Sequence, residues 1–532
     1  MSRLVSHVRF LFLIGMLLLA GCNGQSPAPM VQGNEQSNAP PAAAVKPTGE
    51  IKEGEAWEIC FLQGQRVGYG HSTVRRARED GRDVLHLEKT DHLAIQRAGQ
   101  TSRQEVRALS IETLDGKLLR FENEMRMGAA PIRISGQVRG DRVEAKILGP
   151  GAKTPKKASI PWANDYQGPF ATEQSLLRQP MQPGERRGFK MLMCGFGDVD
   201  VIDVLLVAKK FETVELPNGK KELLRIDASL SLPGGNKMDG VIWTTSVGET
   251  LKQSAAGLDI YRTSKAQALD EKQEKKPAEV DVMARTSVKL VRPLDDPHGA
   301  PQLRFRVHLD GADPSQLFPV GPTQSVQAID KNTAEVTVYG IRPGDKRGNR
   351  EAPADPPSDA ERTPNNFIQS DDSLVVAFAD RAAGEEKDPW RMAVALEQFV
   401  HKVVKHKDFT QGFASAAEVA RSLEGDCTEH AVLLAAMARA KGIPARVAIG
   451  LVYLAPRKLD GSSDPTFFYH MWTEVFVDGR WVPIDGTLAR GGIGAGHLKI
   501  GHSSLQGASV YSAFLPVLNV IGKLRIEPID EP

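Results

Sequence analysis

The sequence has few cysteines and no excess of charge of one sign. Its 532 residues include four cysteines, at positions 22, 60, 194 and 427, too few to indicate a disulfide framework or a zinc cluster. Lys and Arg number 67 and Asp and Glu 66. Phosphate binding needs a basic excess or patch, so this balance argues against a nucleic-acid-binding protein. The apolar fraction of 41% and the charged fraction of 25% are typical of a soluble globular protein, and the length predicts about three folded domains.

The N-terminal apolar run, Phe10–Ala20, is too short to span a membrane stably as a mature helix. It follows a basic start and ends in Leu19-Ala20-Gly21-Cys22. This ending resembles the lipobox of bacterial lipoproteins, in which the cysteine is lipidated. We therefore interpret residues 1–22 as an export signal, with Cys22 as the lipidation site of a membrane-anchored protein of the bacterial cell envelope. A plain secretory signal with an incidental cysteine is the alternative.

The next part of the chain predicts a tether and a β-rich domain. Residues 23–50 are rich in Gly, Ser, Pro, Ala, Gln and Asn, so they have little to bury and predict a disordered tether. Residues 51–265 contain short alternating runs separated by turn signals, which predict strands. Cys60 and Cys194 fall in this domain, and either a disulfide formed after export or two buried thiols fits the sequence. The clearest strands are predicted over Trp57–Phe61, Leu118–Met125 and Leu223–Leu232.

A charged linker leads to a second β-rich segment, at 280–345. Its predicted strands are Ser287–Val291, Gln302–His308 and Ala334–Tyr339. Residues 342–366 are crowded with Pro, Asp, Arg and Asn and predict a long exposed loop.

The C-terminal domain, 367–532, opens with helix signals. Ser370 can cap a helix over Asp371–Arg381 with Leu374, Ala377 and Phe378 on one face. Asp388-Pro389 starts a second helix, and Ser415-Ala416-Ala417-Glu418 matches a capping box for a third. The second helix places four apolar residues at helical spacing: Met392, Leu396, Phe399 and Val403.

Cys427 stands where a buried helix begins. Gly425-Asp426 breaks the chain, and the Ala-, Leu- and Met-rich run that follows is ended by Gly442 and Pro444. Unpaired N–H groups and the positive end of the helix dipole favour a thiolate there. The same N–H groups can hold the oxyanion of a tetrahedral intermediate. Cys427 is therefore a candidate nucleophile, although a cysteine without this context is usually a buried residue.

Asp478-Gly479 predicts a two-residue turn between strands over Tyr469–Val477 and Arg480–Asp485. If Val477 pairs with Arg480, Trp472 lies opposite Asp485 and His470 lies opposite Thr487. His470 and Asp485 are then diagonal neighbours on one face, near enough for their side chains to meet. An acid in this place holds the imidazole in one tautomer. His470 is thus the candidate base and Asp485 the candidate orienting acid.

Several spaced motifs resemble the core of the bacterial transglutaminase-like superfamily, over about residues 367–490. The resemblance implies a papain-like α+β core with a triad of Cys427, His470 and Asp485. The family usually has Pro after the acid, where this chain has Gly486, a difference that concerns the local turn. The β-rich segments are not covered. The matching motifs are Gly425–Ala431, Arg439–Arg446, His470–Val475 and Trp481–Thr487.

The sequence therefore predicts β-rich domains followed by a thiol enzyme that acts on protein or peptide amides through a thioester, resolved by an amine or water. One alternative is a cysteine peptidase or amidase acting on peptide or cell-wall crosslinks. Another is a non-catalytic envelope binding module of the same fold. A third is a metal site of Cys427, His430, His470 and Asp485, which lacks a second closely spaced ligand pair. We expect no metal and no cofactor.

Overall fold

The computed structural model describes residues 51–529, with gaps. The predicted export signal, Cys22 and the tether 23–50 lie outside the described residues. Within those residues, no helix combines the length and the apolar character needed to cross a membrane. The gaps are residues 63, 98, 196, 233–236, 271–286, 344, 346–347, 350, 455–463, 508–509, 511–513, 515 and 518–519.

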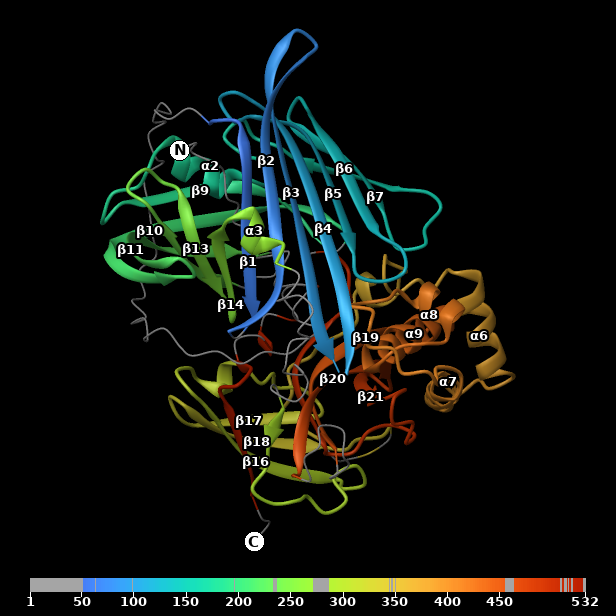
Figure 1. The fold of residues 1–532 in the computed structure, drawn as a ribbon. Helices are drawn as coiled ribbons and strands as arrows, with labels where there is room; N and C mark the ends of the chain where they lie inside the picture. The colour runs from blue at the N-terminus through green and yellow to red at the C-terminus, as the bar shows by residue number, and fades with distance from the viewer. Residues whose placement is uncertain are drawn as a thin grey trace.

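The N-terminal half is one antiparallel sheet of fourteen strands, blue to green in Figure 1. Strands that follow one another in sequence pair, except that β8 and β9 form the two ends and β1 pairs with β14. Buried and exposed residues alternate along strands such as β4, as expected when one face of a sheet covers a core. The elements are β1 Gly54–Leu62, β2 Gln65–Glu79, β3 Arg82–Arg97, β4 Gln100–Thr113, β5 Leu118–Arg126, β6 Ile132–Arg139, β7 Arg142–Leu148, β8 Lys156–Pro161, α2 Ala171–Arg178, β9 Arg186–Cys194, β10 Val199–Leu216, β11 Gly219–Ser231, β12 Lys237–Thr244, β13 Thr250–Ala255, β14 Leu258–Thr263 and α3 Lys265–Ala268.

The predicted strands of this half fall on β1, β5 and β11. Cys60 on β1 and Cys194 at the end of β9 are both buried thiols, not a disulfide. Burial, with the charge of Asp91, raises the pKa of the Cys60 thiol well above its usual range. The sequence left open either a disulfide or two buried thiols, and in the structure Cys60 and Cys194 are two buried thiols.

The second β-rich segment and the C-terminal domain share strands. β15 (Val288–Lys289) pairs with β20 (Thr466–Val477) of the C-terminal domain, and β23 (Leu524–Ile529) pairs with β16 (Gln302–Leu309). The boundary drawn from the sequence between 345 and 367 is therefore crossed by two strand pairings. The four-stranded sheet has the order β17-β18-β16-β23. Its other elements are η1 Pro314–Gln316, β17 Gln324–Asp330, which was not predicted, and β18 Thr333–Tyr339.

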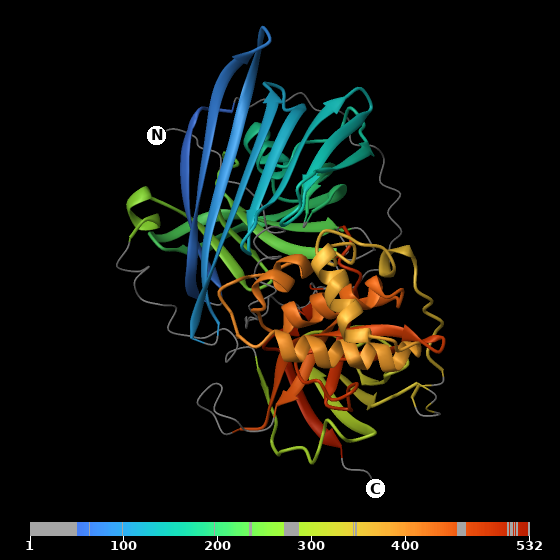
Figure 2. The same ribbon diagram turned by 90° about the vertical axis from the view of Figure 1, so that its right-hand side faces the viewer.

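The C-terminal domain packs helices on a five-stranded sheet, in the order β15-β20-β19-β22 with β21 against β20. In Figure 2 the helices face the viewer and cover the sheet. α9 is buried at nearly every residue and packs against β19, β20 and the other three helices. The elements are η2 Asp359–Glu361, α6 Ser373–Ala383, α7 Pro389–Val403, α8 Ala416–Ser422, α9 Cys427–Ala440, β19 Ala445–Leu454, β21 Arg480–Ile484 and β22 His497–Ser503.

The start of α6 differs from the prediction. Asp372, not Ser370, is the N-cap, because its carboxylate accepts from the N–H groups of Leu374 and Val375. The buried face contains Val375, Ala379 and Ala383, whereas the predicted Ala377 is exposed.

The buried face of α7 also differs from the prediction. It consists of Ala393, Leu396, Glu397 and Val400, while Met392 and Phe399 are only half-buried. The buried face of α7 includes a glutamate, Glu397, which a pattern of apolar residues does not reveal. The face predicted from apolar spacing alone is therefore rotated by about one residue from the observed one. The predicted starts at Pro389 and at the Ser415 capping box are confirmed.

The loop between α7 and α8 joins the two halves of the protein. The N–H of Gly412 donates to the carbonyl of Met127 at 2.6 Å, and the N–H of Phe409 donates to Gln100 Oε1 at 2.9 Å. Ala130 N–H donates to Glu418 Oε1 at 2.9 Å. One contiguous cluster of buried apolar side chains also extends through both halves. The large sheet thus supports the loop that precedes α8 and α9.

We predict that Phe305→Ala destabilises the C-terminal domain although it lies outside the helices. Phe305 on β16 is fully buried, and its ring meets that of Phe467 on β20 edge-on, with centroids 5.6 Å apart. Removing such a ring typically costs about 3–5 kcal/mol. The measurement is urea unfolding followed by alkylation of Cys427, with Ile329→Ala, 52% exposed on β17, as the control. An unchanged midpoint for Phe305→Ala would contradict the shared core.

Candidate active site

The thiol of Cys427 is fixed by the chain that turns into α9. Gly425 has φ of 148°, and a Cβ there would lie 2.3 Å from Cβ of Glu429, so only glycine fits without strain. Asp426 is the N-cap: its carboxylate accepts from Thr428 N–H at 2.8 Å, and Glu429 Oε2 accepts from Asp426 N–H at 2.9 Å. Cys427 is the first helical residue, as predicted. Of the three cysteines in the described part of the chain, it is the partly exposed one.

The helix start leaves one amide beside the sulfur. The cap uses the N–H groups of Thr428 and Glu429, so the N–H of Cys427 itself is the first-turn donor that the cap does not engage. Glu429 also accepts from Ala414 N–H at 3.1 Å, which ties the loop before α8 to the start of α9. Burial, with the charge of Asp426, raises the pKa of Glu429 well above its usual range.

His470 and Asp485 meet as the hairpin register predicts. Val477 pairs with Arg480, and the ladder continues to Thr473 opposite Ile484. β21 ends there, so neither of the two predicted pairings beyond it, Trp472 with Asp485 and His470 with Thr487, belongs to the ladder. The chain turns instead, with Ala489 N–H donating to the carbonyl of Asp485 at 2.7 Å. The Nε2 of His470 lies 2.9 Å from Asp485 Oδ2, and both side chains are buried.

The charges of the pair stabilise each other. Burial alone would lower the pKa of His470, but the charge of Asp485, with further contributions from Cys427, raises it to about 10. Burial would likewise raise the pKa of Asp485, but the facing imidazole holds it well below its usual range. Since Nε2 faces Asp485, Nδ1 is the ring nitrogen left for an interaction with Cys427, which also contributes to the raised pKa of His470. His470 is therefore a cation at neutral pH, placed between a carboxylate and a sulfur.

Glu397 on α7 holds the backbone that carries Asp485. Its carboxylate is fully buried and accepts from Asp485 N–H at 2.9 Å and from Gly491 N–H at 2.8 Å. Burial raises the pKa of Glu397. Sequence reasoning did not single out this residue. The available signal was a glutamate beside Leu396, on the face that α7 buries.

His497 on β22 is a second residue that sequence reasoning missed. Its Nε2 lies 3.2 Å from the same Oδ2 of Asp485. β22 comes close because Gly450 on β19 has no side chain: a Cβ there would lie 2.0 Å from the carbonyl oxygen of Leu498. Gly450 also pairs with His470 on β20. The same glycine is therefore next to both β20, which carries His470, and β22, which carries His497. A lone histidine in a Gly-rich segment gave no pattern to identify it.

The predicted alternative metal site is not assembled as proposed. Nδ1 of His430 bonds to the carbonyl of Asp426 at 2.6 Å. In the described residues, the group of three or more potential ligand atoms within 4.8 Å of one another consists of His470, Asp485 and His497. Both imidazoles already hydrogen-bond Oδ2 of Asp485, at 2.9 and 3.2 Å. The N–H groups of the two imidazoles thus use the lone pairs of Asp485 Oδ2 that a cation at this place would need.

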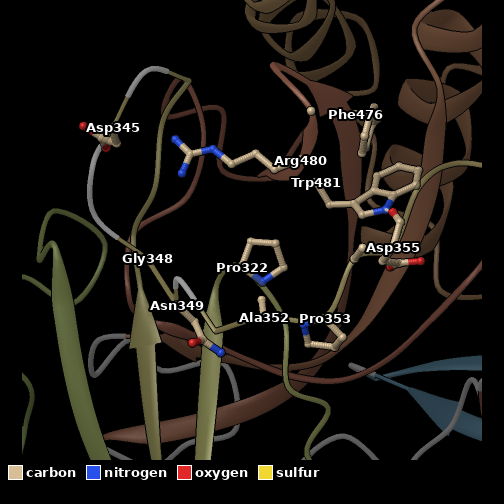
Figure 3. A pocket seen from close by; sticks show the side chains of 12 residues that line it. Pro322, Asp345, Gly348, Asn349, Ala352, Pro353, Asp355, Phe476, Arg480 and Trp481 are labelled. Atoms are coloured by element: carbon tan, nitrogen blue, oxygen red, sulfur yellow. Dashed lines mark hydrogen bonds between the residues drawn. The ribbon is translucent and has the colours of Figure 1, made fainter.

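A separate cavity of about 410 Å³ lies at the other end of the hairpin. Figure 3 shows the Arg480 side chain extending across it above Pro322, with Trp481 and Asp355 at one side. Trp481 donates its indole N–H to the carbonyl of Asp355 at 2.8 Å. None of Cys427, His470 and Asp485 lines this cavity, so it is distinct from the candidate active site.

A thiol at the start of a buried helix, with a His–Asp pair on an adjoining antiparallel hairpin, is the arrangement expected of a papain-like core. Residues 376–486 match the family model of the Transglutaminase-like superfamily. This part of the chain is a transglutaminase-like domain.

No curated protein matches the chain. Among solved structures, it resembles a protein from Cytophaga hutchinsonii described as a candidate cysteine protease (15% identity, 44% of this chain and 84% of that one, TM-score 0.26). It also resembles the periplasmic domain of TgpA from Pseudomonas aeruginosa bound to ethylmercury (16% identity, 37% and 97%, TM-score 0.23). A third similar structure is the hypothetical lipoprotein YmcC from Escherichia coli (11% identity, 40% and 84%, TM-score 0.19).

We predict that Asp485→Asn lowers the pKa of His470 and changes its tautomer. Oδ1 of Asp485 accepts from Thr487 N–H at 2.7 Å, so the asparagine oxygen should stay there and its NH₂ should face His470. A neutral His470 would then accept at Nε2 and carry its proton on Nδ1, toward the sulfur. Nitrogen-15 NMR of the histidine rings measures both changes. An imidazolium that persists to about pH 10 in the variant would rule out Asp485 as the cause of the raised pKa.

Proposed function

We propose that this protein is a thiol enzyme that forms a thioester at Cys427 from an amide of a protein or peptide and resolves it with an amine or water. The observation that supports this most directly is the His470–Asp485 pair, with Nε2 of His470 2.9 Å from Asp485 Oδ2 and with Cys427 contributing to the raised pKa of His470. The transglutaminase-like match to residues 376–486 supports the same class.

In the proposed reaction, the sulfur of Cys427 attacks the amide carbonyl carbon, and the oxygen becomes an oxyanion. The N–H of Cys427 at the start of α9 can donate to that oxyanion. The C–N bond then breaks as His470 gives its proton to the leaving amine, and the thioester remains. His470, now neutral, accepts a proton from the attacking water or amine. The second attack breaks the C–S bond and releases the sulfur of Cys427 as a thiolate beside the imidazolium of His470, the state in which the reaction began.

We expect removal of the sulfur or of the base to abolish turnover. Cys427→Ala should reduce release of ammonia from a carboxamide peptide to background. His470→Ala should lose nearly as much, roughly 10⁴- to 10⁶-fold, because nucleophile and base act as a unit. Parallel incorporation of a fluorescent primary amine distinguishes transfer from hydrolysis.

Two controls accompany this test. Cys60→Ala removes a buried thiol of the large sheet and should leave turnover intact. A chelator should change nothing, because the proposed chemistry needs no metal. Turnover that survives alkylation of Cys427, or that chelation stops, would disprove the cysteine mechanism.

The proposed cellular location rests on the N-terminal sequence. The apolar run that ends at Cys22 supports export and attachment to a membrane of the bacterial cell envelope through a lipid on that cysteine. The substrate would then be a protein or peptide of the envelope.

Cys22→Ser should move the protein from the membrane fraction to the soluble fraction, or leave the unprocessed precursor. The reason is that a hydroxyl cannot take the place of the thiol in lipid attachment. Fractionation and mass spectrometry of the mature N-terminus measure this, with Cys194→Ser as the matched control. Unchanged membrane association of Cys22→Ser, with cleavage at another residue, would show that the motif is incidental.

A further inference from the structure

His497 is a buried histidine aimed at the acid of the proposed triad. It is 3% exposed, and its Nε2 lies 3.2 Å from Asp485 Oδ2, the oxygen that also bonds His470. Its Nδ1 is buried with no hydrogen-bond partner in the described part of the chain. The single strong contact of this imidazole is therefore the carboxylate.

The surroundings of His497 keep it neutral. The rings of Trp472, His298 and His470 lie 5.2, 5.5 and 5.8 Å from its ring. Burial lowers the pKa of His497 to about 4, against the opposing effect of Asp485. A neutral imidazole has one N–H, and the carboxylate requires it on Nε2. His497 thus donates a hydrogen bond without adding a positive charge that would compete with His470.

We propose that His497 is a positioning residue for the thiol chemistry: its neutral Nε2–H fixes the Asp485 carboxylate so that Oδ2 stays aligned with His470. This inference rests on the proposed function. Asp485 must hold His470 in one orientation while the imidazole loses and regains its proton. With His470 as the only donor to Oδ2, that alignment would depend on the group that changes charge. The second donor removes this dependence.

The test compares two substitutions. His497→Leu removes the donor, and we expect kcat to fall about 10- to 100-fold, the effect of one hydrogen bond to a charged group, with little change in KM. The bond from His497 helps to keep the pKa of Asp485 low. Its loss should therefore raise that pKa and move the acid limb of the kcat profile to higher pH. His497→Gln places an amide N–H at a similar reach, so it should retain kcat within about threefold and keep the wild-type profile.

A second readout needs no turnover. The rate of Cys427 alkylation by iodoacetamide, measured against pH, reports the sulfur–imidazole pair directly. Its acid limb should shift in His497→Leu and not in His497→Gln. If Cys427 proved unreactive toward amides, the proposed function would fail while this profile still tested His497. His502→Leu removes an exposed histidine on the same strand and is the matched control.

Two results would overturn the proposal. One is a His497→Leu protein with wild-type alkylation and kcat profiles. The other is an equal loss in the Leu and Gln variants with no shift of the acid limb, which would show that the imidazole only fills space. If His497→Leu does not fold, His497→Asn takes its place, because the shorter amide does not reach Asp485.

Discussion

The burial of one carboxylate, Asp485, is the constraint on which the candidate site depends. A buried charge is tolerated only when it is paired and hydrogen-bonded. Asp485 meets this condition through backbone donors at Oδ1 and two imidazoles at Oδ2. Glu397 holds the backbone N–H of the same residue. These groups come from α7, β20, β22 and the turn after β21, so the elements of the domain must assemble before the acid is satisfied.

The same dependence extends to the large N-terminal sheet. Glu429 joins the start of α9 to Ala414, in the loop that the sheet supports through Gln100 and Met127. The position of the sulfur therefore depends on contacts made about three hundred residues earlier in the chain. This gives the β-rich half a physical role in the site, beyond any binding function of its own.

The parts predicted from the sequence are those set by local chemistry. The turn at Asp478-Gly479 fixed the register that brings His470 to Asp485, and the break at Gly425 marked the start of α9. Other features depend on partners that are distant in sequence. These are the pairing of β15 with β20 and of β23 with β16, the close approach of β22, and the contacts of Glu397 and His497 with Asp485. A pattern read along one segment has no information about such partners. The face of α7 was misplaced for a related reason, because its buried glutamate is satisfied by a loop almost ninety residues later.

A second buried carboxylate, that of Glu474 on β20, is a useful comparison with Asp485. Burial would raise the pKa of Glu474, but Lys499 and Arg446 hold it at about 2, with bonds of 2.7 and 2.8 Å. Arg446 in turn binds Asp355 of the loop 342–366 and lies 3.9 Å over the ring of Trp481. Glu474 is thus balanced by two cations whose role is to hold strands and a loop together. Asp485 is balanced by imidazoles, one neutral and one that can give up its proton. The kind of partner, more than burial, separates the structural acid Glu474 from Asp485, the acid of the candidate site.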